Sequence, residues 1–208
     1  MRSLKKILVG SVCSGIEAAS VALDAGSYKM AWFSEISDFP SGILKEKYPT
    51  TRNLGDLQNV PQFISSGEVE APELICGGTP CQAFSVAGWM SGLEDERGNL
   101  TLRFVDIIEQ NDQVRSRKGA RPTFVLWENV EGVLRDKNNA FGCFLSSLLG
   151  AKTEIEMSKW PVAGVIHGPK RNVAWRVLDA KYFGLPHQRR RLYVIAGGKD
   201  FFPENSVE

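Results

Sequence analysis

The chain has 208 residues, of which 43% are hydrophobic and 24% are charged, and its formal net charge is +1. These values are typical of a soluble globular protein with one well-buried core, and they exclude a protein whose overall charge alone marks it as a nucleic-acid binder. No apolar run approaches the ~18 residues of a membrane span, so we expect a cytoplasmic protein with no membrane contact.

Strand-like and helix-like segments alternate along the chain. Apolar, β-rich runs predict strands over residues 7–12, 30–35, 71–78, 122–130, 173–180 and 190–198, and a strand end at 54–56. Apolar faces at helical spacing predict helices over 15–26, 38–49, 100–110 and 140–150. Residues 83–99 are expected to form a loop, and 160–172 a strand followed by an irregular turn. The alternation indicates an α/β fold with a three-layer, doubly wound, mostly parallel sheet.

Neither the set of cysteines nor the clusters of basic residues indicate a function by themselves. The four cysteines lack C-x-x-C spacing and the chain has two histidines, which does not fit a metal site or a disulfide framework. Cys76 and Cys143 lie in apolar surroundings, so we expect both in the core. Arginines and lysines cluster over 115–121 and 189–191, and the first cluster is expected to be a solvated loop.

Polar and reactive residues follow the predicted strands at five places. They are Cys13, Ser14 and Gly15 after the first strand, Glu35, Asp56, Cys81, and the pair Glu128 and Asn129. Ligands of open α/β sheets bind beyond the carboxyl ends of the strands. We therefore expect these residues to surround a ligand site.

Taken singly, each of these residues has an ordinary structural explanation. Ser14 and Gly15 fit a plain strand-to-helix turn, and Glu35 and Asp56 fit either surface caps or acceptors for ribose hydroxyls. Cys81, fixed between a proline and a glutamine, is either a structural thiol or a nucleophile activated by its surroundings. Glu128 is either an acid at a helix start or a carboxyl group with a working pKa.

Together the residues resemble the cytosine-C5 DNA methyltransferases, including phage and prophage members and enzymes of restriction-modification systems. The matching stretches run in the family's order over nearly the whole chain: SVCSGIEAA (11–19), Glu35, Asp56, GGTPCQAFSVAG (77–88), RGNL (97–100), WENV (127–130) and YFGLPHQRRRLYVI (182–195). The resemblance implies a Rossmann-like methyltransferase fold and S-adenosylmethionine as cofactor.

The resemblance also implies roles for individual residues. Cys81 would add to C6 of a cytosine flipped out of duplex DNA, and Glu128 would bind the ring at N3. The catalytic residues implied are Cys81, Glu128, Arg189 and Arg191. The cofactor contacts implied are Cys13, Ser14, Gly15, Ile16, Glu35, Ile36, Asp56, Gly78, Pro80 and Leu100. The DNA contacts implied are Gln82, Ser85, Arg97 and Asn129.

The chain departs from the family pattern in two ways. Cys13 stands where a phenylalanine is usual, and Ile36 where an aromatic residue is common. We also expect one catalytic domain over 1–198 and a tail over 199–208, without the target-recognition domain and closing motifs of other members.

Three explanations for the missing domain stay open: a catalytic half completed by a second chain, a truncated product, and a minimal enzyme. A catalytically inactive remnant that binds cofactor or a protein partner, and an RNA cytosine-C5 methyltransferase, are the alternative functions. Apolar surface is expected to be exposed near the last strand, which favours a homodimer.

Overall fold

Strands and helices alternate along the chain in the computed structural model, which describes residues 6–23, 26–80 and 100–202. These residues divide into two compact units. The first unit takes its residues from 1–78 and 106–125, and the second from 79–105 and 126–208. Among the described residues, no helix is long and apolar enough to cross a membrane.

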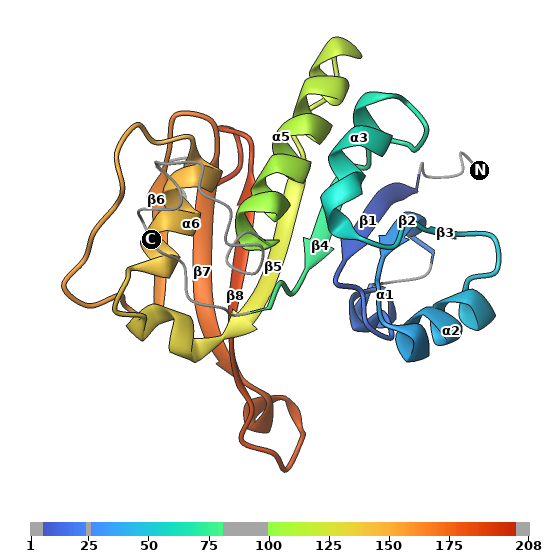
Figure 1. The fold of residues 1–208 in the computed structure, drawn as a ribbon. Helices are drawn as coiled ribbons and strands as arrows, with labels where there is room; N and C mark the ends of the chain where they lie inside the picture. Colours follow the sequence, from blue (N-terminus) through green and yellow to red (C-terminus); the bar gives the residue numbers. More distant parts are fainter. Residues whose placement is uncertain (1–5, 24–25, 81–99, 203–208) are drawn as a thin grey trace. The chain divides into compact units, whose positions relative to one another are not determined.

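The first unit carries four parallel strands in the order β3-β2-β1-β4 (Figure 1). They are β1 (Ile7–Val12), β2 (Tyr28–Ser34), β3 (Arg52–Asn53) and β4 (Leu74–Gly77). The helices are α1 (Ala18–Ala22), α2 (Asp38–Lys47), η1 (Leu57–Asn59) and α3 (Val60–Ser65), with most of α5 (Leu100–Arg117). Trp32 is fully buried over Gly10, where an added Cβ would lie 2.4 Å from the indole ring. Glycine at this point of β1 therefore makes room for the largest core side chain.

The second unit carries strands in the order β5-β8-β7-β6. They are β5 (Phe124–Val130), whose first two residues belong to the first unit, β6 (Ala163–His167), β7 (Asn172–Asp179) and β8 (Arg190–Gly197). The helices are η2 (Glu131–Arg135), α6 (Ala140–Leu149) and η3 (Ala180–Phe183). Aromatic rings fill the core between α6 and the strands. The ring centroids of Phe144 and Trp127 are 4.3 Å apart, and those of Phe141 and Trp175, which meet edge-on, are 5.6 Å apart.

The α/β fold with parallel strands is confirmed, and one part of the predicted topology differs. The pairs β6–β7 and β7–β8 are antiparallel. Parallel neighbours need a crossover of a dozen residues or more, and the connection over 168–171 is too short for one. The segment 160–172 thus contains β6, as expected of it.

Two local predictions were wrong. The helix expected over 15–26 is reduced to α1, because Cys13, Gly15 and Glu17 have φ of 48°, 55° and 66°, which no α-helix accommodates. The basic cluster is solvated at Arg117, Lys118 and Arg121, but Arg115 is a helical residue that is 8% exposed. Its Nε donates to the carbonyl of Arg121 (2.8 Å) and its Nη1 to that of Ala71 (3.2 Å). It ties α5 to the segment that leads into β4.

Cys76 and Cys143 are 2% and 3% exposed, which confirms both as core residues. The domain boundary at residue 198 stays a prediction.

Candidate functional site

A turn with unusual backbone geometry follows β1 in the first unit. Within it, Cys13, Gly15 and Glu17 all adopt positive φ. The Glu35 carboxylate holds this turn, since its Oε2 accepts from the backbone N–H of Gly15 (2.8 Å) and its Oε1 from that of Ser37 (2.8 Å). A residue at the end of β2 therefore fixes both the turn after β1 and the entry to α2.

The space in front of this turn is open. A Cβ added at Gly15 or Gly55 would meet no heavy atom within 4 Å. Ile16 and Ile36 are 53% and 73% exposed, although both are large apolar side chains. Asp56 is exposed and uses one oxygen to cap η1, accepting from the N–H of Gln58 (2.9 Å). Carboxylates beside exposed aliphatic groups suit a nucleoside, whose ribose needs acceptors and whose base needs apolar contact.

Burial controls the ionisable groups beneath the turn. Glu17 is 1% exposed and caps α1, and its burial raises the pKa of the carboxyl group. Burial, and next the charge of Glu35, raise the pKa of the Cys13 thiol to about 11. Cys13 is therefore a neutral thiol at physiological pH, which is compatible with contact to an uncharged part of a ligand.

Two acid–base pairs in the second unit involve consecutive arginines of β8. Arg191 Nε lies 3.0 Å from Glu128 Oε1, and the Glu128 side chain remains 34% exposed. Next to it, Arg190 makes a two-point contact with Glu131, through Nε to Oε2 (2.8 Å) and Nη2 to Oε1 (3.0 Å). The last strand and the end of β5 are thus joined by two neighbouring arginines.

The residue two positions before Cys81 is held by both neighbours of Glu128. Trp127 Nε1 donates to Thr79 Oγ1 (2.9 Å), and Asn129 Nδ2 donates to the Thr79 carbonyl (3.1 Å). The Thr79 hydroxyl also shares a hydrogen bond of 2.7 Å with that of Thr101 at the start of α5. All these groups are at least 95% buried, so Thr79 is held in place by the two residues that flank Glu128 in β5.

The site residues inferred from the sequence fall into three sets. The first unit holds Cys13, Ser14, Gly15, Ile16, Glu35, Ile36, Asp56 and Gly78, and the second holds Pro80, Leu100, Glu128, Asn129, Arg189 and Arg191. Cys81, Gln82, Ser85 and Arg97 lie outside the described residues. The Asn129 amide donates to Thr79 and its oxygen accepts from the N–H of Val130 (2.8 Å), so its role toward DNA stays a prediction.

Sequence reasoning missed Thr79, Glu131 and Arg190. Glu131 directly follows the Glu-Asn-Val stretch and Arg190 lies between the two arginines singled out, so proximity to those motifs was the available signal.

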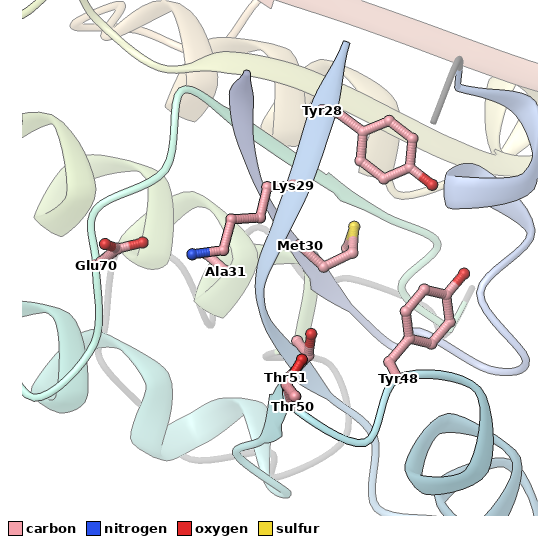
Figure 2. A pocket seen from close by; sticks show the side chains of 8 residues that line it. All are labelled: Tyr28, Lys29, Met30, Ala31, Tyr48, Thr50, Thr51 and Glu70. Carbon is pink, nitrogen blue, oxygen red and sulfur yellow. The ribbon is translucent and has the colours of Figure 1, made fainter. Parts of the chain in front are cut away.

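A separate hollow of about 270 Å³ lies along β2 in the first unit (Figure 2). Figure 2 shows Tyr28, Met30 and Tyr48 on one side of β2 and Lys29 and Glu70 on the other. Both tyrosine hydroxyls are bonded to Ser20, Tyr28 donating to its carbonyl (2.6 Å) and Tyr48 contacting its hydroxyl. The hollow adjoins the first residues of β2, so it is separate from the residues that follow the strand ends.

Comparisons with known proteins identify the family and the fold of the chain. The family model for C-5 cytosine-specific DNA methylases matches residues 7–207. The chain is 44% identical to a DNA N-6-adenine-methyltransferase of Escherichia phage P1, over 94% of the chain and 29% of that protein. It is 30% identical to the orphan methyltransferase M.SPRI of Bacillus phage SPR, over 94% of the chain and 38% of that protein.

Among solved structures, the S. pombe Dnmt2 methyltransferase shares the fold, with a TM-score of 0.62 and 16% identity over 94% of this chain and 50% of that one. The chain thus spans between about a quarter and two fifths of the length of the two phage relatives. Family and fold are those of S-adenosylmethionine-dependent methyltransferases. The chain belongs to the C-5 cytosine-specific DNA methylase family.

Proposed function

We propose that the chain is the catalytic part of a methyltransferase that modifies carbon 5 of cytosine in DNA through a covalent adduct with Cys81. One observation carries this proposal: Trp127 and Asn129, the neighbours of Glu128, both donate hydrogen bonds to Thr79. Cys81 follows Thr79 by two positions. The segment that leads to the nucleophile is therefore anchored to the strand that carries the acid. Nucleophilic catalysis on a ring requires such a pair.

The residues supply the chemistry as follows. The Cys81 thiolate adds to C6 of the flipped base, and the electron pair of the 5,6 double bond moves toward C5 and the N3 edge. Glu128, with its side chain one-third exposed, shares a proton with N3, so that the carboxyl O–H donates to the ring nitrogen and stabilises this electron-rich ring. After methylation, water or hydroxide takes the C5 proton, the electron pair of that C–H bond re-forms the 5,6 double bond, and the C6–S bond breaks to release the Cys81 thiolate. Arg191 holds one oxygen of Glu128, which leaves the other for the base.

The first unit fits S-adenosylmethionine. Bound there, the cofactor supplies an electrophilic methyl group on a sulfonium centre. Glu35 and Asp56 accept from the ribose hydroxyls, and the exposed Ile16 and Ile36 contact the adenine ring. Both Glu35 oxygens already accept one backbone N–H, yet each carboxylate oxygen has a second lone pair for a ribose hydroxyl.

DNA is the proposed partner, and its affinity for this chain is expected to be weak and sensitive to salt. The parts of the phage relatives that this chain does not match are where target recognition is expected. A longer chain or a second subunit supplies that part in this proposal, and a homodimer stays a prediction.

Analysis of the methylated product tests the proposal. The chain is incubated with labelled cofactor and duplex DNA, with matched RNA as a second substrate, and the nucleosides are separated. We expect label in 5-methylcytosine from DNA, and none with the C81S or E128Q variants. Label in RNA alone would instead support the RNA enzyme. Cofactor binding without any product, even after a protein that carries the missing target-recognition part is added, would support the inactive remnant.

A second candidate comes from the phage P1 relative, whose name specifies adenine N6. The match covers 29% of that protein, and within it this chain carries the Pro-Cys-Gln and Glu-Asn-Val stretches. Methylation of an exocyclic amine needs no covalent attack on the ring, so a cysteine so placed favours cytosine. N6-methyladenine as the product would reverse this choice.

A further inference from the structure

The β7–β8 ribbon gathers a set of side chains on one face. Leu178 pairs with Arg191, and Arg176 with Tyr193, and residues directly opposite on antiparallel strands share a face. The ribbon continues past its last pair, since the N–H of Ala180 donates to the carbonyl of Arg189 (3.1 Å). With the two-residue period of a strand, Arg189, Arg191 and Tyr193 therefore point to the same side.

A cavity of about 260 Å³ lies on this face. Its apolar walls are Leu178, Phe183, Leu185 and Tyr193, and its lining includes Arg189 and Arg191. The volume is below the ~300–1,000 Å³ of clefts that hold drug-sized ligands, so it suits a small unit such as one nucleotide. We name it the Arg189 pocket.

The segment between β7 and β8 that helps to form this pocket extends away from the strands (Figure 1). Its apolar side chains face solvent, with Tyr182, Phe183 and Leu185 at 77%, 68% and 58% exposed. Exposed aromatic rings beside cations are typical of surfaces on which nucleic-acid bases stack.

Charge distinguishes Arg189 from its neighbours. Arg190 is paired with Glu131, Arg191 with Glu128, and Lys181 lies 3.8 Å from Asp179. Within the described part of the chain, the Arg189 guanidinium makes no hydrogen bond or ion pair. Its backbone is nevertheless fixed, since its N–H donates to Asp179 Oδ1 (3.1 Å). A guanidinium on a fixed backbone beside an apolar pocket is suited to bind an anion that carries an apolar group.

We propose that the Arg189 pocket binds one nucleotide of the DNA next to the target cytosine, with Arg189 on its phosphate and Phe183 stacked on its base. This assignment rests on the proposed function, because DNA is the ligand that joins phosphate to a flat apolar ring. Arg191 lines the pocket and also contacts Glu128, so a nucleotide held here adjoins the proposed catalytic pair. An acidic protein segment would bind the Arg189 guanidinium but would offer no base to stack on the Phe183 ring.

Salt-dependent DNA binding separates the two contacts. Binding of the full chain to a fluorescent duplex is followed by anisotropy from about 50 to 200 mM salt. Loss of one phosphate contact in R189Q should lower the slope of log affinity against log salt by about 0.9. F183A should weaken binding about 5- to 150-fold with the slope unchanged, and F183W should bind as the wild type does. K152Q, which removes an exposed charge outside the pocket, is the matched control.

An R189Q slope equal to that of the wild type, or F183A affinity equal to that of the wild type, overturns the pocket assignment. So does a wild-type chain that binds no DNA. The proposed function is judged separately by the methylated nucleoside. If the wild type forms 5-methylcytosine and the R189Q and F183A variants bind DNA as the wild type does, the pocket assignment alone is rejected. If the salt slopes and affinities are as expected but no 5-methylcytosine forms, the proposed function alone is rejected.

Discussion

The Thr79 hydroxyl is the group whose removal tests the anchored turn most sharply. In T79V a methyl group of similar size replaces the hydroxyl, so Trp127 Nε1–H loses its acceptor and the Thr101 hydroxyl loses its partner. Trp127 is fully buried and Thr101 is 1% exposed, so water cannot replace either bond. An orphaned buried polar group costs about 1–3 kcal/mol. The Thr101 hydroxyl can rotate and costs less, which gives about 2–4 kcal/mol in total.

Urea unfolding measures this loss. With a slope of about 2 kcal/mol/M, the midpoint of T79V should fall by about 1–2 M. T79S keeps the hydroxyl and should lose about 1 kcal/mol or less, for one buried methyl group. Hydrogen exchange of the Trp127 indole N–H, observed by NMR, should become faster in T79V but not in T79S. A T79V midpoint within about 0.2 M of the wild type, with a protected indole, would refute the reasoning.

Three further predictions follow from the acids and thiols. E131Q should lower stability by about 0.5–1 kcal/mol, because Arg190 is half exposed and solvent screens the pair. E131Q should also lower kcat, because Arg191 is misplaced, while the Kd for S-adenosylmethionine is unchanged. E131D should restore part of the rate. An unchanged kcat in E131Q would count against a positioning role for Glu131. Burial raises the pKa of Cys76 to about 12 and that of Cys143 to about 11, so at pH 8 about one Cys143 thiol in a thousand or fewer is ionised. Iodoacetamide should therefore label Cys81 first, and equal labelling of C81S by mass spectrometry would contradict this. Burial raises the pKa of Glu17 above 4.5, so its contribution to stability is complete below pH 4.5 and is lost as pH rises through the raised value. E17Q should thus unfold at a higher temperature than the wild type at pH 8 but not at pH 4, and a wild type that is the more stable of the two at pH 8 would show this argument to be wrong.

Local patterns in the sequence were sufficient to predict most of the strands and helices of the first unit. Alternating apolar runs and helical faces predict β1, β2, β4 and α2, because these elements depend on burial of one face against a parallel sheet. Glu35 was identified from its place after β2, but its bonds to the N–H groups of Gly15 and Ser37 were not. Those bonds depend on the positive φ values of the turn, which two non-glycine residues adopt against their intrinsic preference.

The second unit was less accessible to sequence reasoning. The sequence pattern of an apolar strand does not depend on whether its neighbour is parallel or antiparallel. The antiparallel pairing of β6, β7 and β8 was therefore not predicted. Glu128 and Arg191 are 63 positions apart in the sequence, and their contact follows from the placement of β8 next to β5. Thr79 carries no motif of its own, since its role arises from three side chains that fold around it.

The central claim, covalent attack by Cys81 on cytosine, is tested most directly by trapping the adduct. The chain is incubated with S-adenosylmethionine and duplex DNA that contains 5-fluorocytosine, in which fluorine at C5 cannot leave as the proton does. The account predicts an intact-protein mass increased by one methylated DNA strand, with the modification on the peptide that contains Cys81, and no adduct with C81S. Methylation of ordinary DNA without any trapped adduct, or an adduct that persists in C81S, would contradict it.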